Sequence, residues 1–132
     1  MLFFDEDYPR HSSAYKDCIF VFGSNLAGRH GAGAAKCARE NYGAKNGVGI
    51  GLTGQSYAIP TKGADLDVLA LEYIHHQVKD FLEYARYYEH EVFFVTRIGC
   101  GLAGYTDAQI APMFRGAPEN CIFDIKWRDF LI

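Results

Sequence analysis

The sequence has no excess of basic residues, which limits the partners that it can attract by charge alone. Its 13 lysines and arginines are outnumbered by 16 aspartates and glutamates, and the formal net charge is -3. Proteins that bind duplex DNA or anionic membranes without sequence preference carry a positive surface field. We therefore expect no membrane partner and no general binding to nucleic acid.

Long apolar runs and paired cysteines are also missing. No run approaches the roughly 18 apolar residues that a membrane-spanning helix needs, and the apolar start of the chain turns acidic at Asp5. The four cysteines, Cys18, Cys37, Cys100 and Cys121, include no Cys-x-x-Cys pair and form no zinc framework. Buried thiols in a reducing cytoplasm explain Cys18, Cys37 and Cys121 best. We expect a soluble cytoplasmic protein without a metal or a cofactor.

Strong polarity is a further feature that the chain lacks. Its 132 residues are 49% apolar and 15% aromatic, which argues against disorder and is enough for one domain over residues 1–132. The 14 glycines are unevenly placed, because ten lie between Gly23 and Gly63 and three lie within Gly99–Gly104. This clustering is the first indication of a functional region.

Apolar runs and helical spacing alternate along the chain. Apolar runs predict strands, and three-or-four spacing or a capping box predicts helices. The pattern predicts a three-layer α/β domain whose sheet is largely parallel and flanked by helices. Residues 44–56 are expected to be irregular, and Pro60 is expected at the end of its strand or at a sheet edge. The predicted strands are residues 18–22, 57–60, 92–95 and 121–125, and the predicted helices are 33–42, 66–89 and 106–115.

Two glycine loops follow predicted strands and precede predicted helices, at residues 23–34 and 99–104. Ligands of open α/β sheets bind at such strand ends. Glycine lets backbone N–H groups approach an anion, and the following helix adds partial positive charge. The two loops together predict a pyrophosphate site, with tight turns as the alternative. The first loop is neither a P-loop nor a clean dinucleotide fingerprint. The predicted contacts are Gly31, Ala32, Gly33 and Ala34 in the first loop, and Gly99, Cys100, Gly101, Leu102, Ala103 and Gly104 in the second.

Polar side chains near these loops each have two interpretations. Asn25 is a candidate for a sugar hydroxyl contact or a turn former. His30 is a candidate phosphate or substrate contact, or a solvent-facing loop histidine. Lys62, which follows Thr61 at the end of a strand, either points into the same crevice or lies on the surface. Cys100 could be a low-pKa thiol near a helix N-terminus, but no histidine partner is evident.

Three strings of residues resemble the macrodomain superfamily: Phe22–Asn25 with His30–Ala35, Tyr57–Lys62, and Thr96–Leu102. The resemblance is strongest to the branch of terminal ADP-ribose glycohydrolases and DNA-deribosylating antitoxin macrodomains. It spans residues 18–125, and the chain is similar to compact macrodomain-like proteins of phages and bacteria. The string Arg-Ile-Gly-Cys-Gly-Leu is its most specific part.

The resemblance implies a mixed sheet with ADP-ribose across the strand ends and its pyrophosphate in the two glycine loops. Lys62 occupies the position of the lysine that attacks the anomeric carbon of the distal ribose in that branch, and Asn25 that of an asparagine contacting the same ribose. The assisting aspartate is replaced by Ala103. Asp107, four residues downstream, is either a substitute for it or an acidic residue of a helix first turn.

Three functions therefore stay open. The first is binding of ADP-ribose or a related NAD-derived nucleotide, free or on a macromolecule, with hydrolysis of an ADP-ribosyl linkage by Lys62. The second is a non-catalytic binding module, which Ala103 favours. The third is a domain that has kept the fold and lost the ligand. Trp127 and Phe123, near the last predicted strand, are the candidates for an adenine contact. Without the aspartate, His30 and Asp107 are the alternative groups for activating water.

Overall fold

The strands form one mixed sheet, and five of the six strands found in the described residues are parallel. The computed structural model describes residues 1–5 and 16–132. The strand order is β1-β6-β5-β2-β4-β3, and only the β3–β4 pair is antiparallel. The predicted α/β class with a largely parallel sheet is confirmed. The strands are β1 (Leu2–Phe4), β2 (Ile19–Asn25), β3 (Gly51–Thr53), β4 (Ser56–Lys62), β5 (Phe93–Val95) and β6 (Cys121–Asp124).

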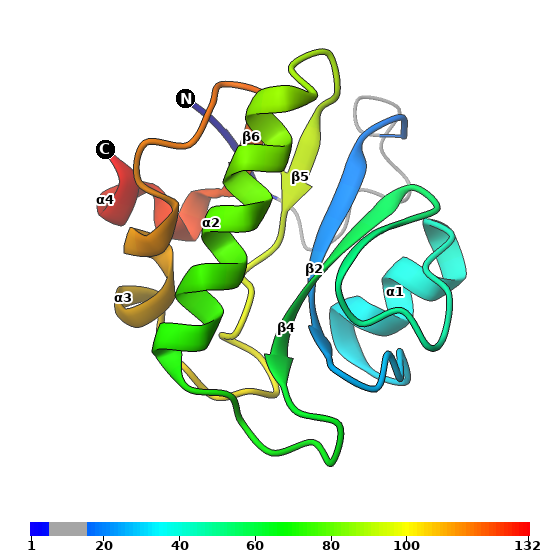
Figure 1. Cartoon of the computed structure of the whole chain (residues 1–132). Helices are drawn as coiled ribbons and strands as arrows, with labels where there is room; N and C mark the ends of the chain where they lie inside the picture. Colours follow the sequence, from blue (N-terminus) through cyan, green and yellow to red (C-terminus); the bar gives the residue numbers. More distant parts are fainter. Residues whose placement is uncertain (6–15) are drawn as a thin grey trace.

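Helices cover both faces of the sheet (Figure 1). Helix α1 lies on one face, and α2, α3 and α4 lie on the other. Successive residues of β2 alternate between two apolar clusters, with Phe20 and Phe22 toward α1 and Ile19 and Val21 toward α2. A strand that is buried on both faces needs a continuous apolar run, which explains why β2 lacks polar alternation. The helices are α1 (Gly33–Asn41), α2 (Leu71–Tyr87), α3 (Asp107–Ile110) and α4 (Arg128–Leu131), with 3-10 turns at Ala111–Phe114 and Ile125–Trp127.

The long amphipathic helix begins later than its apolar spacing indicates. We expected it to start at residue 66, but α2 begins at Leu71. A tight turn occupies the intervening residues: Gly63 N–H donates to Asp67 O at 2.7 Å and Leu66 N–H to Gly63 O at 3.1 Å. Leu66 has a φ of +66°, a left-handed conformation that a helix does not contain. Local turn chemistry therefore overrides the helical spacing.

The predicted irregular segment 44–56 contains β3, which was not expected. Three residues of β3 pair with Ser56–Ala58 of β4. Pro60 was expected at a strand end or edge, but β4 continues through it to Lys62 and lies between β2 and β3. The β3 ladder stops at Ala58, so Pro60 costs no hydrogen bond to that neighbour. No helix in the described part of the chain is long and apolar enough to cross a membrane.

Other local predictions are confirmed. Gly43 follows α1 with a φ of +73°, as expected for a residue after a helix end. Thr106 and Gln109 form the predicted capping box at α3. The helical segment continues from Ala111 to Phe114 as a 3-10 turn that contains Pro112. Cys18, Cys37 and Cys121 are buried, as expected.

Candidate functional site

The connections of the two central strands leave a crevice at the carboxyl edge of the sheet. After β2 the chain runs through α1 to β4 on one side, and after the neighbouring β5 it runs through α3 to β6 on the other. Two adjacent strands whose connections diverge form the switch point at which α/β proteins bind ligands. The two glycine loops are the segments that leave β2 and β5, so they face each other across this crevice.

A cavity of about 630 Å³ lies at this edge. Its walls come from the ends of β1, β2, β4, β5 and β6, the start of α1 and both glycine loops. Most of the predicted contacts line it, whereas His30, Gly104 and Asp107 do not. The predicted residues in the lining are Asn25, Gly31, Ala32, Gly33, Ala34, Thr61, Lys62, Gly99, Cys100, Gly101, Leu102 and Ala103.

The glycines of the two loops serve different purposes. A Cβ at Gly31, Gly33 or Gly101 would meet no heavy atom within 4 Å, and all three residues line the cavity. A Cβ at Gly28 would lie 2.5 Å from the backbone of Gly47. Gly28 is therefore needed for packing, while the open glycines keep backbone N–H groups accessible from the cavity.

Both loops present backbone donors to the cavity. Helix α1 begins after Ala32, which offers no side-chain cap, and its first turn has no acidic residue. The first N–H groups of a helix lack intrahelical partners, and here Gly33, Ala34 and Ala35 all line the cavity. In the second loop, the amides of residues 101–103 donate to no protein acceptor among the described residues. These two rows of donors suit an anion with two charged groups.

Asn25 is used to fix the first loop. Its Nδ2 donates to Arg29 O at 2.8 Å, and its Oδ1 accepts from Arg29 N at 2.9 Å. The turn-forming interpretation of Asn25 therefore describes its side chain in this structure. The residue still lines the cavity, and the loop that it closes carries Arg29 to the same wall.

His30 is neither a solvent-facing residue nor part of the cavity wall. Its ring is 1% exposed and packs edge-on against Phe22. Its Nε2 lies 3.0 Å from Lys45 O and 3.1 Å from Val48 O. Two carbonyl oxygens around one nitrogen require that nitrogen to carry the hydrogen. His30 thus ties the first glycine loop to residues 45–48. Its buried position does not favour the prediction that it contacts a ligand or activates water.

Lys62 lies at the end of β4, directly beside Asn25 of β2. Its backbone accepts a hydrogen bond from Leu26 at 3.0 Å, and its half-buried side chain lines the cavity. In the described residues no carboxylate lies within ion-pair distance of its ammonium group. The neighbouring Thr61 is buried and donates to Ser24 O at 3.4 Å. The sequence-based expectation that Lys62 faces the crevice agrees with this placement.

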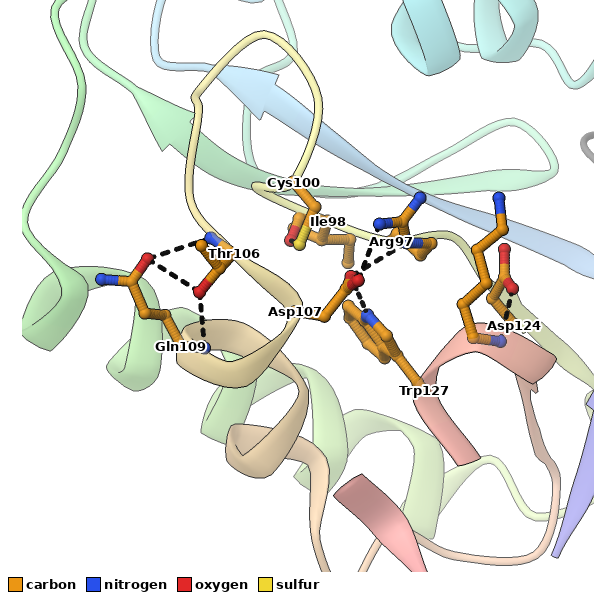
Figure 2. Close-up of polar contacts among 9 residues, drawn as sticks. Arg97, Ile98, Cys100, Thr106, Asp107, Gln109, Asp124 and Trp127 are labelled. Carbon is orange, nitrogen blue, oxygen red and sulfur yellow. Dashed lines mark hydrogen bonds and ion pairs between the residues drawn. The ribbon is translucent and has the colours of Figure 1, made fainter. Parts of the chain in front are cut away.

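Asp107 is bound by other side chains and is not on the cavity wall. Arg97 donates to it through Nε at 2.9 Å and Nη2 at 2.8 Å, and the Trp127 indole donates to the same carboxylate at 2.7 Å (Figure 2). The Arg97 guanidinium holds the pKa of Asp107 below its usual value. A carboxylate with these partners is a poor base. The geometry therefore does not favour the prediction that Asp107 substitutes for the missing aspartate. Trp127 and Phe123 are fully buried and cannot contact adenine directly.

Cys100 does not have the chemistry of a nucleophile. Burial and the nearby Asp107 carboxylate raise its pKa to about 12. Its Sγ donates a weak hydrogen bond to Ile98 O at 3.6 Å. The low-pKa interpretation is therefore wrong. Within the part of the chain that the structure describes, no group of three or more metal-ligating side chains is present.

The cavity is basic although the chain is acidic overall. Arg29, Lys62, Arg97 and Lys126 line it, against the single acidic residue Asp124 among the described residues. Sequence reasoning missed Arg29, Arg97, Asp124 and Lys126 as site residues. Arg97 and Asp124 were recoverable, because both stand at the carboxyl ends of predicted strands. Phe4, which also lines the cavity, was not recoverable because β1 was not predicted.

Comparison with known proteins identifies the fold. No family model and no curated protein matches the chain. The solved macrodomain of Mycobacterium tuberculosis DarG is similar over 94% of this chain and 97% of that one, with a TM-score of 0.67 and 18% identity. The chain has a macrodomain fold.

Two further structures share this macrodomain fold. A Bacteroides thetaiotaomicron protein of unknown function is similar over 94% of this chain and 97% of its own, with a TM-score of 0.60 and 12% identity. Thermosipho africanus DarTG in complex with ADP-ribose is similar over 85% of this chain, with a TM-score of 0.59 and 12% identity. The macrodomain-like chain spans 39% of that longer protein.

Proposed function

We propose that this protein binds ADP-ribose, free or attached to a macromolecule. The observation that carries the proposal is the pair of backbone donor rows, one at Gly33–Ala35 and one at residues 101–103, on opposite sides of one cavity. Amide donors in two loops fit two linked phosphates better than one. The macrodomain fold, which DarTG displays with ADP-ribose bound, supports the same ligand.

The dimensions of the cavity support a long ligand. The wall includes the ends of five adjacent strands, from β1 through β6, β5 and β2 to β4. Four gaps of about 4.8 Å make this edge about 19 Å long. That length accommodates a nucleoside, a diphosphate and a second sugar in a row, and the volume is within the usual range for small-molecule sites. A mononucleotide would leave much of the edge empty.

The charge distribution supports a diphosphate. The four basic side chains of the cavity attract an anion locally, although the chain as a whole carries -3. Charges separated by more than about 8 Å are largely screened at physiological salt, so the nearby groups outweigh the net charge. Hydrogen bonds from amides to charged phosphate oxygens add direction to this attraction.

We further propose that Lys62 reacts with the distal ribose and so hydrolyses an ADP-ribosyl linkage. The Lys62 amine, once it has lost a proton, attacks the anomeric carbon, and the bond from that carbon to the carrier breaks. The carrier leaves with its bonding electrons and takes up a proton. Water then attacks the same carbon, releases ADP-ribose and returns the amine. The absence of an ion-pair partner in the described residues and the position at the cavity edge support this role for Lys62.

A non-catalytic binding module is the second candidate function, and one observation favours it. Ala103 stands where the resemblance places the assisting aspartate, and Asp107 is engaged by Arg97 and Trp127. The one carboxylate that lines the described cavity is Asp124, at the end of β6, three strands from Lys62 on β4. Water near the distal ribose therefore lacks an evident base, which favours slow turnover, a long-lived Lys62 adduct or binding alone.

Binding is tested by isothermal calorimetry with ADP-ribose. We expect a saturable heat, and a weaker response to adenosine, which has no phosphate. No heat with folded protein at high micromolar ADP-ribose would contradict both candidate functions and favour a domain that has lost its ligand.

The reaction is tested with ADP-ribosylated protein and DNA as substrates and with intact mass as a second readout. Lys62→Ala should abolish turnover and any adduct while largely keeping ADP-ribose affinity. Lys36→Ala, a change of an exposed lysine on α1 outside the cavity, is the matched control and should change neither. Ala103→Asp should speed release of ADP-ribose. Equal turnover by wild type and Lys62→Ala would exclude the lysine mechanism, and no turnover or adduct in wild type would leave binding as the function.

A further inference from the structure

Arg97 enters the cavity wall in a fixed orientation. It lies two residues beyond β5, between the end of β6 and the first glycine loop, and lines the cavity. Its guanidinium makes a two-point contact with Asp107, from Nε to Oδ1 at 2.9 Å and from Nη2 to Oδ2 at 2.8 Å. Figure 2 shows the Asp107 carboxylate between this guanidinium and the Trp127 indole. The three side chains come from separate segments, so tertiary structure holds this arrangement.

We propose that Asp107 and Trp127 are positioning residues that hold Arg97 ready to bind the diphosphate, and that Trp127 reports this contact. The proposal rests on the proposed binding of ADP-ribose and deepens it. It gives Asp107 a role that acts through Arg97, in place of the catalytic role expected from the sequence.

The free edge of Arg97 provides the binding group. A guanidinium has five N–H donors, and the contact with Asp107 uses two of them. Within the described residues no acceptor takes the Nη1 hydrogens, and the side chain is 33% exposed. A planar fork of N–H donors matches phosphate geometry. Arg97 therefore adds side-chain donors beside the backbone donors of the second loop.

Trp127 fixes the other side of the carboxylate. Its indole Nε1 donates to Asp107 Oδ1 at 2.7 Å, so that oxygen accepts from both Trp127 and Arg97. Trp127 is 0% exposed and packs against Phe114 and Phe123. A carboxylate held from both sides limits the rotamers of Arg97 before a ligand arrives, which lowers the entropy lost on binding.

The pairing also determines what Arg97 contributes. Because the Asp107 charge offsets the Arg97 charge, the pair offers oriented donors with little net charge. Arg29, Lys62 and Lys126 have no partner carboxylate within ion-pair distance in the described residues. We therefore expect the loss of Arg97 to weaken diphosphate binding while changing the salt dependence of affinity less than the loss of Lys126 does.

Trp127 is the only tryptophan of the chain, so its fluorescence isolates this site. In wild type, ADP-ribose and inorganic pyrophosphate should change its emission, and adenosine should not. Arg97→Ala should remove the response and lower ADP-ribose affinity by about tenfold or more, the range for a charged hydrogen bond. The single change Asp107→Asn should lower ADP-ribose affinity. The same change added to Arg97→Ala should have little further effect, because Asp107 acts through Arg97.

Asp129→Asn is the matched control, since Asp129 is exposed and lies two residues from Trp127. It should change neither affinity nor the ligand response. Trp127→Phe keeps an aromatic ring and removes the N–H donor, so calorimetry on that variant tests the same contacts if Asp107→Asn does not fold. We expect it to lower ADP-ribose affinity less than Arg97→Ala does.

Two results would overturn the proposal. One is wild-type affinity for ADP-ribose in Arg97→Ala, and the other is fully additive losses from Arg97→Ala and Asp107→Asn. Neither result requires the proposed function to fail, because calorimetry on the wild type measures ADP-ribose binding separately. If the wild type itself binds no ADP-ribose, the proposed function fails first and this proposal fails with it.

Discussion

Alanine at Gly31 and at Gly101 tests whether the two glycine loops bind phosphate. Both residues line the cavity, neither has a positive φ, and an added Cβ would meet nothing within 4 Å at either. The folded state can therefore accept the methyl group without overlap. The free energy of unfolding should stay the same or rise by about 0.4–1 kcal/mol, because alanine restricts the unfolded chain.

Binding should respond in the opposite direction. A methyl group at either position blocks the close approach of a phosphate oxygen to the neighbouring amides. The loss of one hydrogen bond to a charged group costs about 1.5–3 kcal/mol, which weakens binding roughly tenfold to over one hundredfold. If the ligand spans both loops, each single variant should show a loss of this size.

The assay pairs calorimetry with ADP-ribose and urea unfolding of the same samples. Gly28→Ala is the contrasting control, because its φ is +70° and its Cβ would lie 2.5 Å from the Gly47 backbone. That variant should lose about 1–3 kcal/mol of stability through overpacking. Wild-type affinity in both Gly31→Ala and Gly101→Ala, with stability unchanged, would show that the loops are only turns.

Three further changes test other parts of the structure. Leu66 has a φ of +66°, which strains any residue with a side chain, so Leu66→Gly should raise the free energy of unfolding in urea by about 1 kcal/mol. A lower free energy of unfolding would show that the leucine side chain contributes more than the strain costs. Because Arg97 lowers the native pKa of Asp107, its carboxylate stabilises the fold above about pH 4 and that stability is lost as pH falls through the native pKa. The melting temperature of Asp107→Asn should therefore approach that of wild type below about pH 4, and a constant difference would contradict this sign. The pKa values of Cys18, Cys100 and Cys121 are raised to about 12, so iodoacetamide at pH 8 should modify them far more slowly in native than in unfolded protein, as intact mass would measure.

The sequence predicted the parts of the fold that depend on local signals. The apolar runs of β2, β4, β5 and β6 and the capping box of α3 needed no information from distant residues. The short strands β1 and β3 were missed. Three residues are too few to show a period of two, and neither strand has a four-residue run of β-branched and aromatic residues such as Val92–Val95, which identified the equally short β5. The start of α2 was placed too early because Leu66 and Leu69 happen to match helical spacing.

The sequence indicated most of the backbone that lines the cavity, but not the contacts of its polar side chains. Glycine loops at strand ends can be recognised locally, and most of their residues line the cavity. The partners of His30 and Asp107 are distant in sequence, with Val48 eighteen residues from His30 and Trp127 twenty residues from Asp107. No local pattern indicates such contacts. The sequence therefore identified which segments form the site, while only the structure showed which polar groups are already occupied.

The pairing of β1 with β6, the first and last strands along the chain, has a consequence for folding. β1 pairs only with β6 in the described residues, and Leu2 aligns with Ile122. The contact between β1 and β6 joins residues that are far apart in the sequence, so it closes a long loop and forms slowly. The contact between β2 and β4 joins residues that are much closer in sequence and can form earlier. Phe4 of β1, Asp124 of β6 and nearby Lys126 complete one end of the cavity together. A ligand that reaches this end would contact both β1 and β6, and its binding would therefore stabilise the pairing of these two strands.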